Sequence, residues 1–118
     1  DAIANRMVEL GYVNDATFAE ARARGLGRRG MGAARVRAAL SAHGIGADEQ
    51  AAALSGHDAL EAAIRFAQRK RLGPFGPPAA DPAARQRQLA AMARAGHPPD
   101  LARRILRARS EEELPDEA

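Results

Sequence analysis

The sequences LSAHGIGADEQAAAL (residues 40–54) and MARAGHPPDLARRIL (residues 92–106) share a spacing that decides the fold. In each, a glycine follows a large apolar residue by four positions and precedes an aspartate by four and a leucine by ten. The two sets are Leu40, Gly44, Asp48 and Leu54, and Met92, Gly96, Asp100 and Leu106. Glycine is a typical helix stop, and an aspartate soon after it can begin another helix. We therefore predict two copies of one helical unit, against the alternative of coincidence among residues that are common at helix ends.

Apolar residues recur every three or four positions through the rest of the chain, which is typical of helices. The expected helical segments are residues 1–10, 15–24, 32–43, 48–54, 58–71, 82–95 and 98–109. Gly11 is expected to end the first helix, and Asn14 or Asp15 to cap the second. The glycine-rich stretch 25–32 and the Pro/Gly stretch 72–80 are expected to be loops. No segment alternates apolar and polar residues as a β-strand does. We therefore predict an all-α, elongated array of tandem three-helix repeats.

Charge is distributed unevenly along the 118 residues. The chain has 18 lysines and arginines and 15 acidic residues, and five of the acids lie in residues 110–118. Residues 1–109 therefore carry a formal charge of +8, from 18 bases and 10 acids, which suits a polyanionic or acidic partner. We expect the acidic tail, residues 110–118, to be disordered. Because Asp1 already lies inside a helical pattern, we also expect an N-terminal piece to precede it.

The composition argues against several classes of protein. Cysteine is absent, which excludes disulfides and thiol catalysis, and no apolar run approaches the roughly 20 residues of a membrane span. We expect a cytoplasmic protein with no membrane association, no cofactor and no metal. His43, His57 and His97 lack the partners of a metal site and are expected to be exposed at helix ends. No serine or glycine-rich loop has a catalytic or nucleotide-binding context, so we expect no enzymatic activity.

Basic residues gather near the expected helix ends. The candidate partner-binding residues are Arg28, Arg29, Arg35, Arg37, Arg69, Lys70, Arg71, Arg94, Arg103 and Arg104. Because tandem repeats bring equivalent helix ends to one side of an array, we predict that they contribute to one partner-facing surface. The alternative is a set of solvated faces and favourable charges at helix C-termini. A second alternative is a helix-turn-helix DNA-binding protein over residues 32–54, although its second helix would begin with Asp48 and Glu49 and offer no basic side chain to read bases.

The chain resembles the RecX family of regulatory proteins. The stretch GYVNDATFA at residues 11–19 is similar to that family's G-Y-L-D/N-D-x-x-F-A signature. The stretch at residues 29–45 is similar to its R-G-x-G-x-x-x-I-x-x-x-L-x-x-K-G-I segment, and the basic residues at 69–70 and 94 fit its third repeat. The motif residues are Gly11, Tyr12, Asn14, Asp15, Phe18, Gly44 and Gly96, whereas Ala39, His43 and His97 depart from the family pattern.

The resemblance implies an architecture and a partner. Residues 1–11 would be the last helix of a truncated first repeat, 12–55 a second repeat and 57–109 a third. RecX-like proteins bind the helical groove of the RecA recombinase filament on DNA and suppress its ATP hydrolysis, strand exchange and coprotease activity. The resemblance therefore implies a monomeric, non-enzymatic regulator of RecA, with the DNA phosphate backbone as a further contact. We also expect Tyr12 and Phe18 to pack in the small core of the second repeat.

Overall fold

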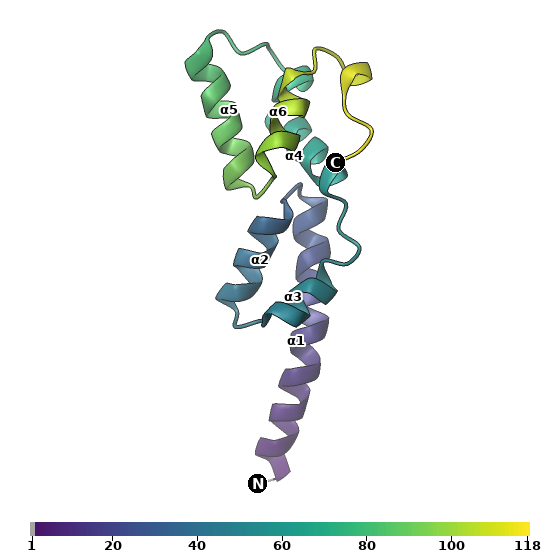
Figure 1. The fold of residues 1–118 in the computed structure, drawn as a ribbon. Helices are drawn as coiled ribbons and strands as arrows, with labels where there is room; N and C mark the ends of the chain where they lie inside the picture. Colours follow the sequence, from purple (N-terminus) through teal and green to yellow (C-terminus); the bar gives the residue numbers. More distant parts are fainter. Residues whose placement is uncertain (1) are drawn as a thin grey trace.

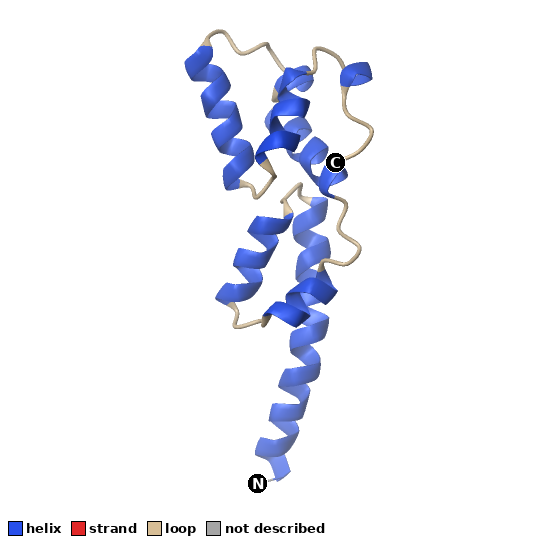
Figure 2. Cartoon of the chain, viewed as in Figure 1, coloured by secondary structure: helices blue, strands red, loops and turns tan. Residues whose placement is uncertain are grey.

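The computed structural model describes the backbone of residues 2–118 and the side chains of residues 15–118. Six α-helices and two single-turn 3-10 helices make up the regular structure, and residues 2–118 contain no strand (Figure 2). The α-helices are α1 (Ala2–Arg28), α2 (Ala33–Ala42), α3 (Ala47–Ala53), α4 (Ala59–Lys70), α5 (Pro82–Arg94) and α6 (Pro99–Arg107). The 3-10 helices are η1 (Gly73–Phe75) and η2 (Glu111–Glu113). The prediction of an all-α chain is confirmed.

The helices form two units that follow one another along the length of the molecule (Figure 1). The C-terminal part of α1 packs against α2 and α3, and α4 packs against α5 and α6. We call these the α1–α3 unit and the α4–α6 unit. The molecule measures 64 × 26 × 19 Å, which confirms the expected elongated shape. The repeat boundaries inferred from the sequence stay a prediction.

The first helix, α1, is continuous where we expected two separate helices. α1 runs through Gly11, which we predicted to end a helix, and through Asn14 and Asp15, which we predicted to cap the next one. These predictions were wrong because one glycine inside a helix costs only about 1 kcal/mol relative to alanine. Tertiary packing of the buried stripe through Ala19 and Ala23 stabilises the helix beyond Gly11.

The same helix also extends into the stretch that we predicted to be a loop. α1 includes Gly25 and Gly27 and ends at Arg28, and the chain turns at Gly30 with φ +86°. The apolar stripe of the helix explains this extension, because Leu26 is only 6% exposed and belongs to the core of the α1–α3 unit. Burial of one leucine contributes about 2 kcal/mol, which offsets two helical glycines.

Four helices end in the same hydrogen-bonded turn. In each, a backbone N–H donates to the carbonyl five positions earlier at 2.8–3.1 Å. The residue immediately before the donor has a left-handed backbone. These residues are Gly30, Gly44, Arg71 and Gly96. The turns at Gly44 and Gly96 are the ones marked by the repeated spacing, and the apolar residues four positions before them, Leu40 and Met92, are fully buried. Both glycines therefore stop helices as predicted.

Aspartates begin two of the helices that the sequence predicts. Asp58 accepts a hydrogen bond from the Glu61 N–H at 2.9 Å and caps α4. Asp81 accepts from the Ala84 N–H at 2.8 Å and caps α5, with a proline in its first turn. Asp48 does not cap α3, because the cap position is taken by a glycine and Asp48 lies inside the first turn. There it still favours the helix through the macrodipole.

Each unit has a small core in which alanines let the helices approach closely. The α1–α3 core consists of Ala19, Ala23, Leu26, Val36, Leu40 and Ile45. The α4–α6 core consists of Ala63, Phe66, Ala67, Met92, Ala95, Leu101, Ala102 and Ile105. Met31 packs against both cores and joins them. Because six of these fourteen residues are alanines, the loss of one large residue removes a substantial part of a core.

Phe18 does not occupy the core position that we predicted. Its side chain is 38% exposed and packs against the ring of His43, with ring centroids 4.9 Å apart. Since α1 is one straight helix, the buried stripe passes through Ala19 and Ala23, and Phe18 lies beside that stripe. The predicted packing of Tyr12 lies outside the residues whose side chains are described.

We expect Phe18→Ala to reduce the free energy of unfolding by about 1–2 kcal/mol, because the side chain is only partly buried. Leu40→Ala should cost about 3–5 kcal/mol, since that side chain is fully buried. Urea unfolding followed by circular dichroism measures both values. A Phe18→Ala cost equal to that of Leu40→Ala would place Phe18 in the core after all.

The acidic tail, which we predicted to be disordered, takes a defined path in the structure. Residues Glu111–Glu113 form η2, and the Glu113 carboxylate accepts from the Arg109 N–H at 2.7 Å. Leu114 packs against the α4–α6 core, and Arg104 donates to the backbone oxygen of Glu117 at 2.6 Å. One leucine and two hydrogen bonds are sufficient to hold this short segment against α6.

Candidate partner-binding surface

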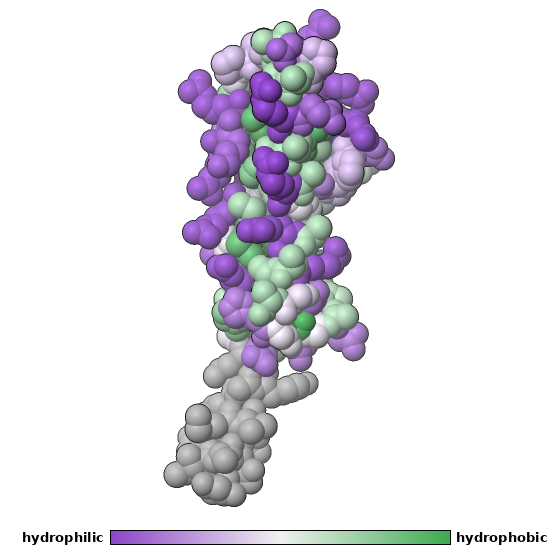
Figure 3. Space-filling view, turned by 90° about the vertical axis from the view of Figure 1, so that its left-hand side faces the viewer, coloured by the Kyte–Doolittle hydropathy of each residue, from purple (hydrophilic) through white to green (hydrophobic). Residues whose placement is uncertain are grey.

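The predicted basic residues lie at the molecular surface. Arg104 is half-buried, and the others are exposed, namely Arg28, Arg29, Arg35, Arg37, Arg69, Lys70, Arg71, Arg94 and Arg103. From the side that carries α2 and α5, hydrophilic side chains surround smaller hydrophobic areas over both units (Figure 3). The surface therefore offers charged groups to a partner along much of its length.

The two units meet through direct backbone contacts. The turn that follows α1, residues 29–32, lies between α4 and the end of α5, and the Gly32 N–H donates to the Ala95 carbonyl at 2.7 Å. A Cβ on Gly32 would lie 2.8 Å from the His97 nitrogen, and one on Gly30 would lie 2.6 Å from the Phe66 nitrogen. Such contacts are too close for any side chain. We call residues 29–32 the junction turn.

The junction brings basic residues of the two units together. Arg69 of α4 donates to the backbone carbonyl of Arg29 at 3.3 Å. On α2, the backbone of Arg35 lies against Gly96, two positions after Arg94, and a Cβ on Gly96 would lie 2.6 Å from the Arg35 Cβ. Arg29, Arg69, Arg35 and Arg94 thus lie around one junction. A partner that spans the two units would meet arginines from both.

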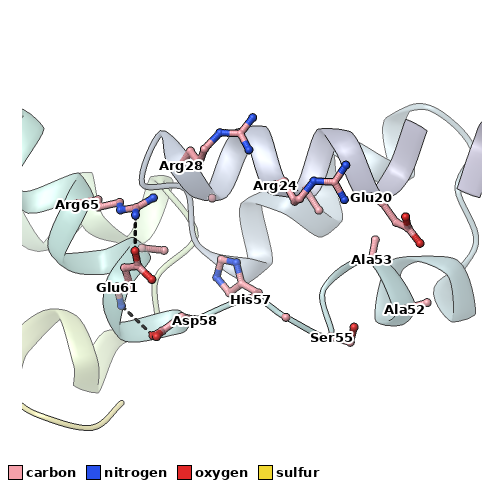
Figure 4. Close-up of a pocket in the computed structure, with 14 residues that line it drawn as sticks. Glu20, Arg24, Arg28, Ala52, Ala53, Ser55, His57, Asp58, Glu61 and Arg65 are labelled. Carbon is pink, nitrogen blue, oxygen red and sulfur yellow. Dashed lines mark hydrogen bonds and ion pairs between the residues drawn. The ribbon is translucent and has the colours of Figure 1, made fainter. Parts of the chain in front are cut away.

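A groove of about 490 Å³ opens beside the junction (Figure 4). Arg24 and Arg28 project from α1 along one wall, and Arg65 of α4 forms an ion pair with Glu61 on the other. His57 lies between the walls, in the segment that links α3 and α4. The exposed ion pair contributes little to stability, so its acidic and basic groups can be rearranged by a charged partner.

His97 is buried at the junction, which corrects the prediction that it is exposed. The ring is 4% exposed, and its Nε2 donates to the Gly30 carbonyl at 2.8 Å. Because a carbonyl only accepts, Nε2 carries the proton, and Nδ1 is buried without a hydrogen-bond partner. Burial lowers the pKa of His97 below its usual value of 6.5, against the opposing effect of the Gly30 hydrogen bond. The histidine therefore joins the two units in its neutral form.

His57 has a similar environment on the other side of the junction. Its Nε2 is buried without a hydrogen-bond partner, and burial lowers its pKa, against the raising effect of Asp58. The nearby His57 also lowers the pKa of His97. The residues with described side chains contain no group of three or more histidines and carboxylates that could hold a metal ion.

We expect the protein to lose stability between about pH 6.5 and pH 5, above the range in which Asp and Glu titrate. The folded-state pKa of His97 lies below its unfolded value, so the unfolded chain binds more protons as the pH falls. The stability is complete above the unfolded pKa and decreases below it. His97→Gln, which keeps a donor for the Gly30 carbonyl, should flatten this dependence in thermal unfolding curves measured across that range. An unchanged pH profile in the variant would show that His97 does not titrate in this way.

Other predicted site residues have no described contact across the junction. Lys70 and Arg71 directly follow Arg69 at the C-terminal end of α4, where Arg71 has a left-handed backbone with φ +58°. Arg103 forms an ion pair with Asp100 at 2.9 Å, and Arg104 is bonded to the tail. We predicted from the sequence that the basic residues form one surface, and for those at the junction this stays a prediction. The two arginines of α6 instead have partners of their own within the chain.

Sequence comparison identifies the α1–α3 unit. Residues 14–54 match the family model described as RecX, second three-helix domain. The α1–α3 unit is similar to a RecX domain. The matched segment contains the C-terminal half of α1 together with α2 and α3, which is the unit that packs around Leu40. No curated protein and no solved structure matches the chain. Within the described part of the chain, no helix is long and apolar enough to cross a membrane.

The junction between the two units was not predicted from the sequence. Gly30, Gly32 and Gly96 were interpreted as a loop and a helix stop, yet each also lies against the backbone of the other unit. His97 was interpreted as an exposed residue. One indication of the junction was present in the sequence. Both Gly30 and Gly32 lie near the end of a helix, although a helix stop requires only one glycine. Their partners lie more than 30 positions away in the sequence and cannot be inferred from it.

Proposed function

We propose that this protein is a negative regulator of the RecA recombinase that binds the groove of the RecA filament on DNA. The observation that carries the proposal is the match of residues 14–54 to a RecX three-helix domain. RecX-family proteins are regulators, and the proposal assigns this chain the suppression of ATP hydrolysis, strand exchange and coprotease activity. It assigns no catalysis to the chain itself and places it in the cytoplasm as a monomer.

The shape and charge of the molecule support this proposal. A rod 64 Å long can contact more than one subunit of a helical filament. Backbone contacts at Gly32 and Gly96 hold the two units in a fixed relation, so little conformational entropy is lost when both bind at once. Arginines around the junction can meet carboxylates of the groove or phosphates of the bound DNA.

A stand-alone helix-turn-helix protein fits the structure less well. α3 would be the helix that reads bases, but Asp48 and Glu49 lie in its first turn and the helix contains no lysine or arginine. Negative charge at that end would be repelled by phosphates, and no side chain of α3 suits the edge of a guanine. DNA contact through phosphates remains part of the filament proposal, with RecA as the principal partner.

Co-sedimentation tests the proposed binding. We expect the protein to pellet with RecA filaments assembled on single-stranded DNA, and to remain in the supernatant with the same amount of DNA alone. The reason is that a filament offers both protein carboxylates and DNA phosphates to the arginines, whereas bare DNA offers only phosphates. Equal pelleting with bare DNA would favour the DNA-binding alternative, and no pelleting with filaments would overturn the proposal.

A further inference from the structure

A second groove, distinct from the junction, opens in the α4–α6 unit. It has a volume of about 680 Å³ and lies between η1, the loop that follows it, α5 and α6. Figure 1 shows α5 and α6 side by side, with the loop crossing above them. The groove contains none of the junction residues, and its properties are independent of the proposed regulation of RecA.

The floor and walls of this groove are apolar and fixed. Leu89 of α5 and Leu106 of α6 are half-buried, and they contribute to the lining together with three prolines of the loop and the start of α5. Gly73 has φ +57°, and a Cβ there would lie 3.1 Å from the Ile105 carbonyl oxygen. The loop therefore packs closely on α6 and cannot easily collapse into the groove. A preformed apolar groove binds with less loss of entropy than one that must be ordered.

The rim of the groove is strongly basic. Arg85, Arg103, Arg107 and Arg109 all line it, and no acidic residue does. Arg103 is partly neutralised by Asp100, whereas Arg109 contacts the Glu113 carboxylate through its backbone N–H and not through its guanidinium group. Among the described residues, Arg85 and Arg107 form no ion pair. The groove thus combines apolar surface with at least two uncompensated guanidinium groups.

We propose that this groove binds an acidic protein segment that carries a large apolar side chain. The leucines and prolines would cover the apolar side chain, and the arginines would bind carboxylates on either side of it. Nucleic acid fits less well, because phosphates gain nothing from an apolar floor. The lining also contains no aromatic ring on which a base could stack.

The tail of this chain shows how α6 holds such a segment. The tail runs on the other side of α6 from α5 (Figure 1). Within it, Leu114 packs against the α4–α6 core and has acidic residues on both sides in the sequence. Arg104 donates to the backbone oxygen of Glu117, and the Glu113 carboxylate accepts from the Arg109 N–H. An apolar residue between acidic residues is thus held beside α6, with hydrogen bonds that each use one backbone atom. The groove likewise places apolar residues beside arginines, and no segment of the described chain is seated in it.

A peptide-binding experiment tests the proposal with the full chain. The probe is a fluorescein-labelled synthetic peptide of about ten residues, long enough to span the groove when extended, with Glu and Asp residues on both sides of a Leu-Phe pair. Fluorescence anisotropy should show saturable binding at or below about 100 µM peptide. Replacing the acidic residues of the peptide with Gln and Asn, or its Leu-Phe pair with Ser-Ser, should each weaken binding at least about tenfold.

Two double variants with the same change of charge locate the site. Arg85→Glu with Arg107→Glu removes the uncompensated rim charges and should weaken binding at least about tenfold. Arg22→Glu with Arg87→Glu is the control, because both arginines are exposed and line neither groove. Equal weakening in the two variants would overturn the proposal, as would the absence of binding at about 1 mM peptide.

Competition separates the proposed occupant from two others. An oligothymidylate that displaces the peptide and binds more tightly, with the same loss in the Arg85→Glu, Arg107→Glu variant, would assign the groove to nucleic acid instead. A synthetic peptide with the sequence of residues 110–118 that binds as tightly, together with concentration-dependent dimerisation of the chain, would assign it to the tail of a second copy. Either result would overturn the proposal. None of these measurements uses RecA, so their failure is distinct from failure of the proposed regulation.

Discussion

Gly32→Ala is expected to destabilise the protein by about 3 kcal/mol. A Cβ at this position would lie 2.8 Å from the His97 nitrogen and even closer to the Gly96 carbonyl. Both atoms belong to backbone, so no change of rotamer relieves the clash, and overpacking of this kind costs about 1–3 kcal/mol or more. The Gly32 N–H would also move away from the Ala95 carbonyl that it now contacts at 2.7 Å. We expect the two units to separate partly, which urea unfolding and small-angle scattering would both detect.

Gly25→Ala is the matched control and should change stability in the opposite direction. Gly25 lies inside α1, and a Cβ there would meet no atom within 4 Å. Alanine should therefore stabilise the helix by about 0.5–1 kcal/mol. If both variants destabilise equally, or if Gly32→Ala leaves the unfolding midpoint unchanged, the close contact at the junction does not exist in solution.

Reversing charge on both sides of the junction is expected to weaken the inhibition of RecA. Arg35→Glu with Arg69→Glu replaces two exposed arginines, one from each unit, that lie next to the contact between the units. At least about tenfold more variant than wild-type protein should be needed to halve RecA ATP hydrolysis at low salt. The difference should shrink as salt rises toward about 1 M, where charges more than about 3 Å apart are screened.

The Arg22→Glu, Arg87→Glu variant is the control for this experiment as well. It carries the same net charge as the junction variant, and both of its arginines are exposed. Circular dichroism should show equal helix content in all three proteins. If the control loses as much inhibition as the junction variant, the effect depends on net charge and not on the junction. If neither variant loses inhibition, the arginines at the junction form only a solvated face.

The sequence predicted the helices and most of their ends more reliably than it predicted where one helix continues without a break. The spacing around Gly44 and Gly96 marked two helix ends because the left-handed turn that closes a helix favours glycine strongly. Gly11 gave the same local signal, yet α1 passes through it. The difference lies in tertiary packing, because the helix beyond Gly11 carries the buried stripe of Ala19 and Ala23. This balance cannot be judged from one residue.

The candidate site was only partly predictable. The basic residues were identified from the sequence, and we expected them to be exposed because arginine is almost never buried without a partner. The contact between Gly32 and Gly96 was not predictable, since it depends on how two units meet across 64 positions of sequence. The burial of His97 follows from the same contact, and a histidine beside a helix stop is otherwise most simply interpreted as exposed.

ATP hydrolysis by RecA tests the central proposal most directly. RecA on single-stranded DNA is assayed with increasing amounts of the full chain, at a fixed salt concentration and with the DNA saturated by RecA. We predict that hydrolysis falls progressively to a low plateau, that the chain alone hydrolyses no ATP, and that the Arg35→Glu, Arg69→Glu variant shifts the curve to higher concentration. A rate of RecA hydrolysis that stays constant while the chain pellets with the filament, or an absence of any effect at a large excess of chain, would contradict the assignment of this protein as a negative regulator of RecA.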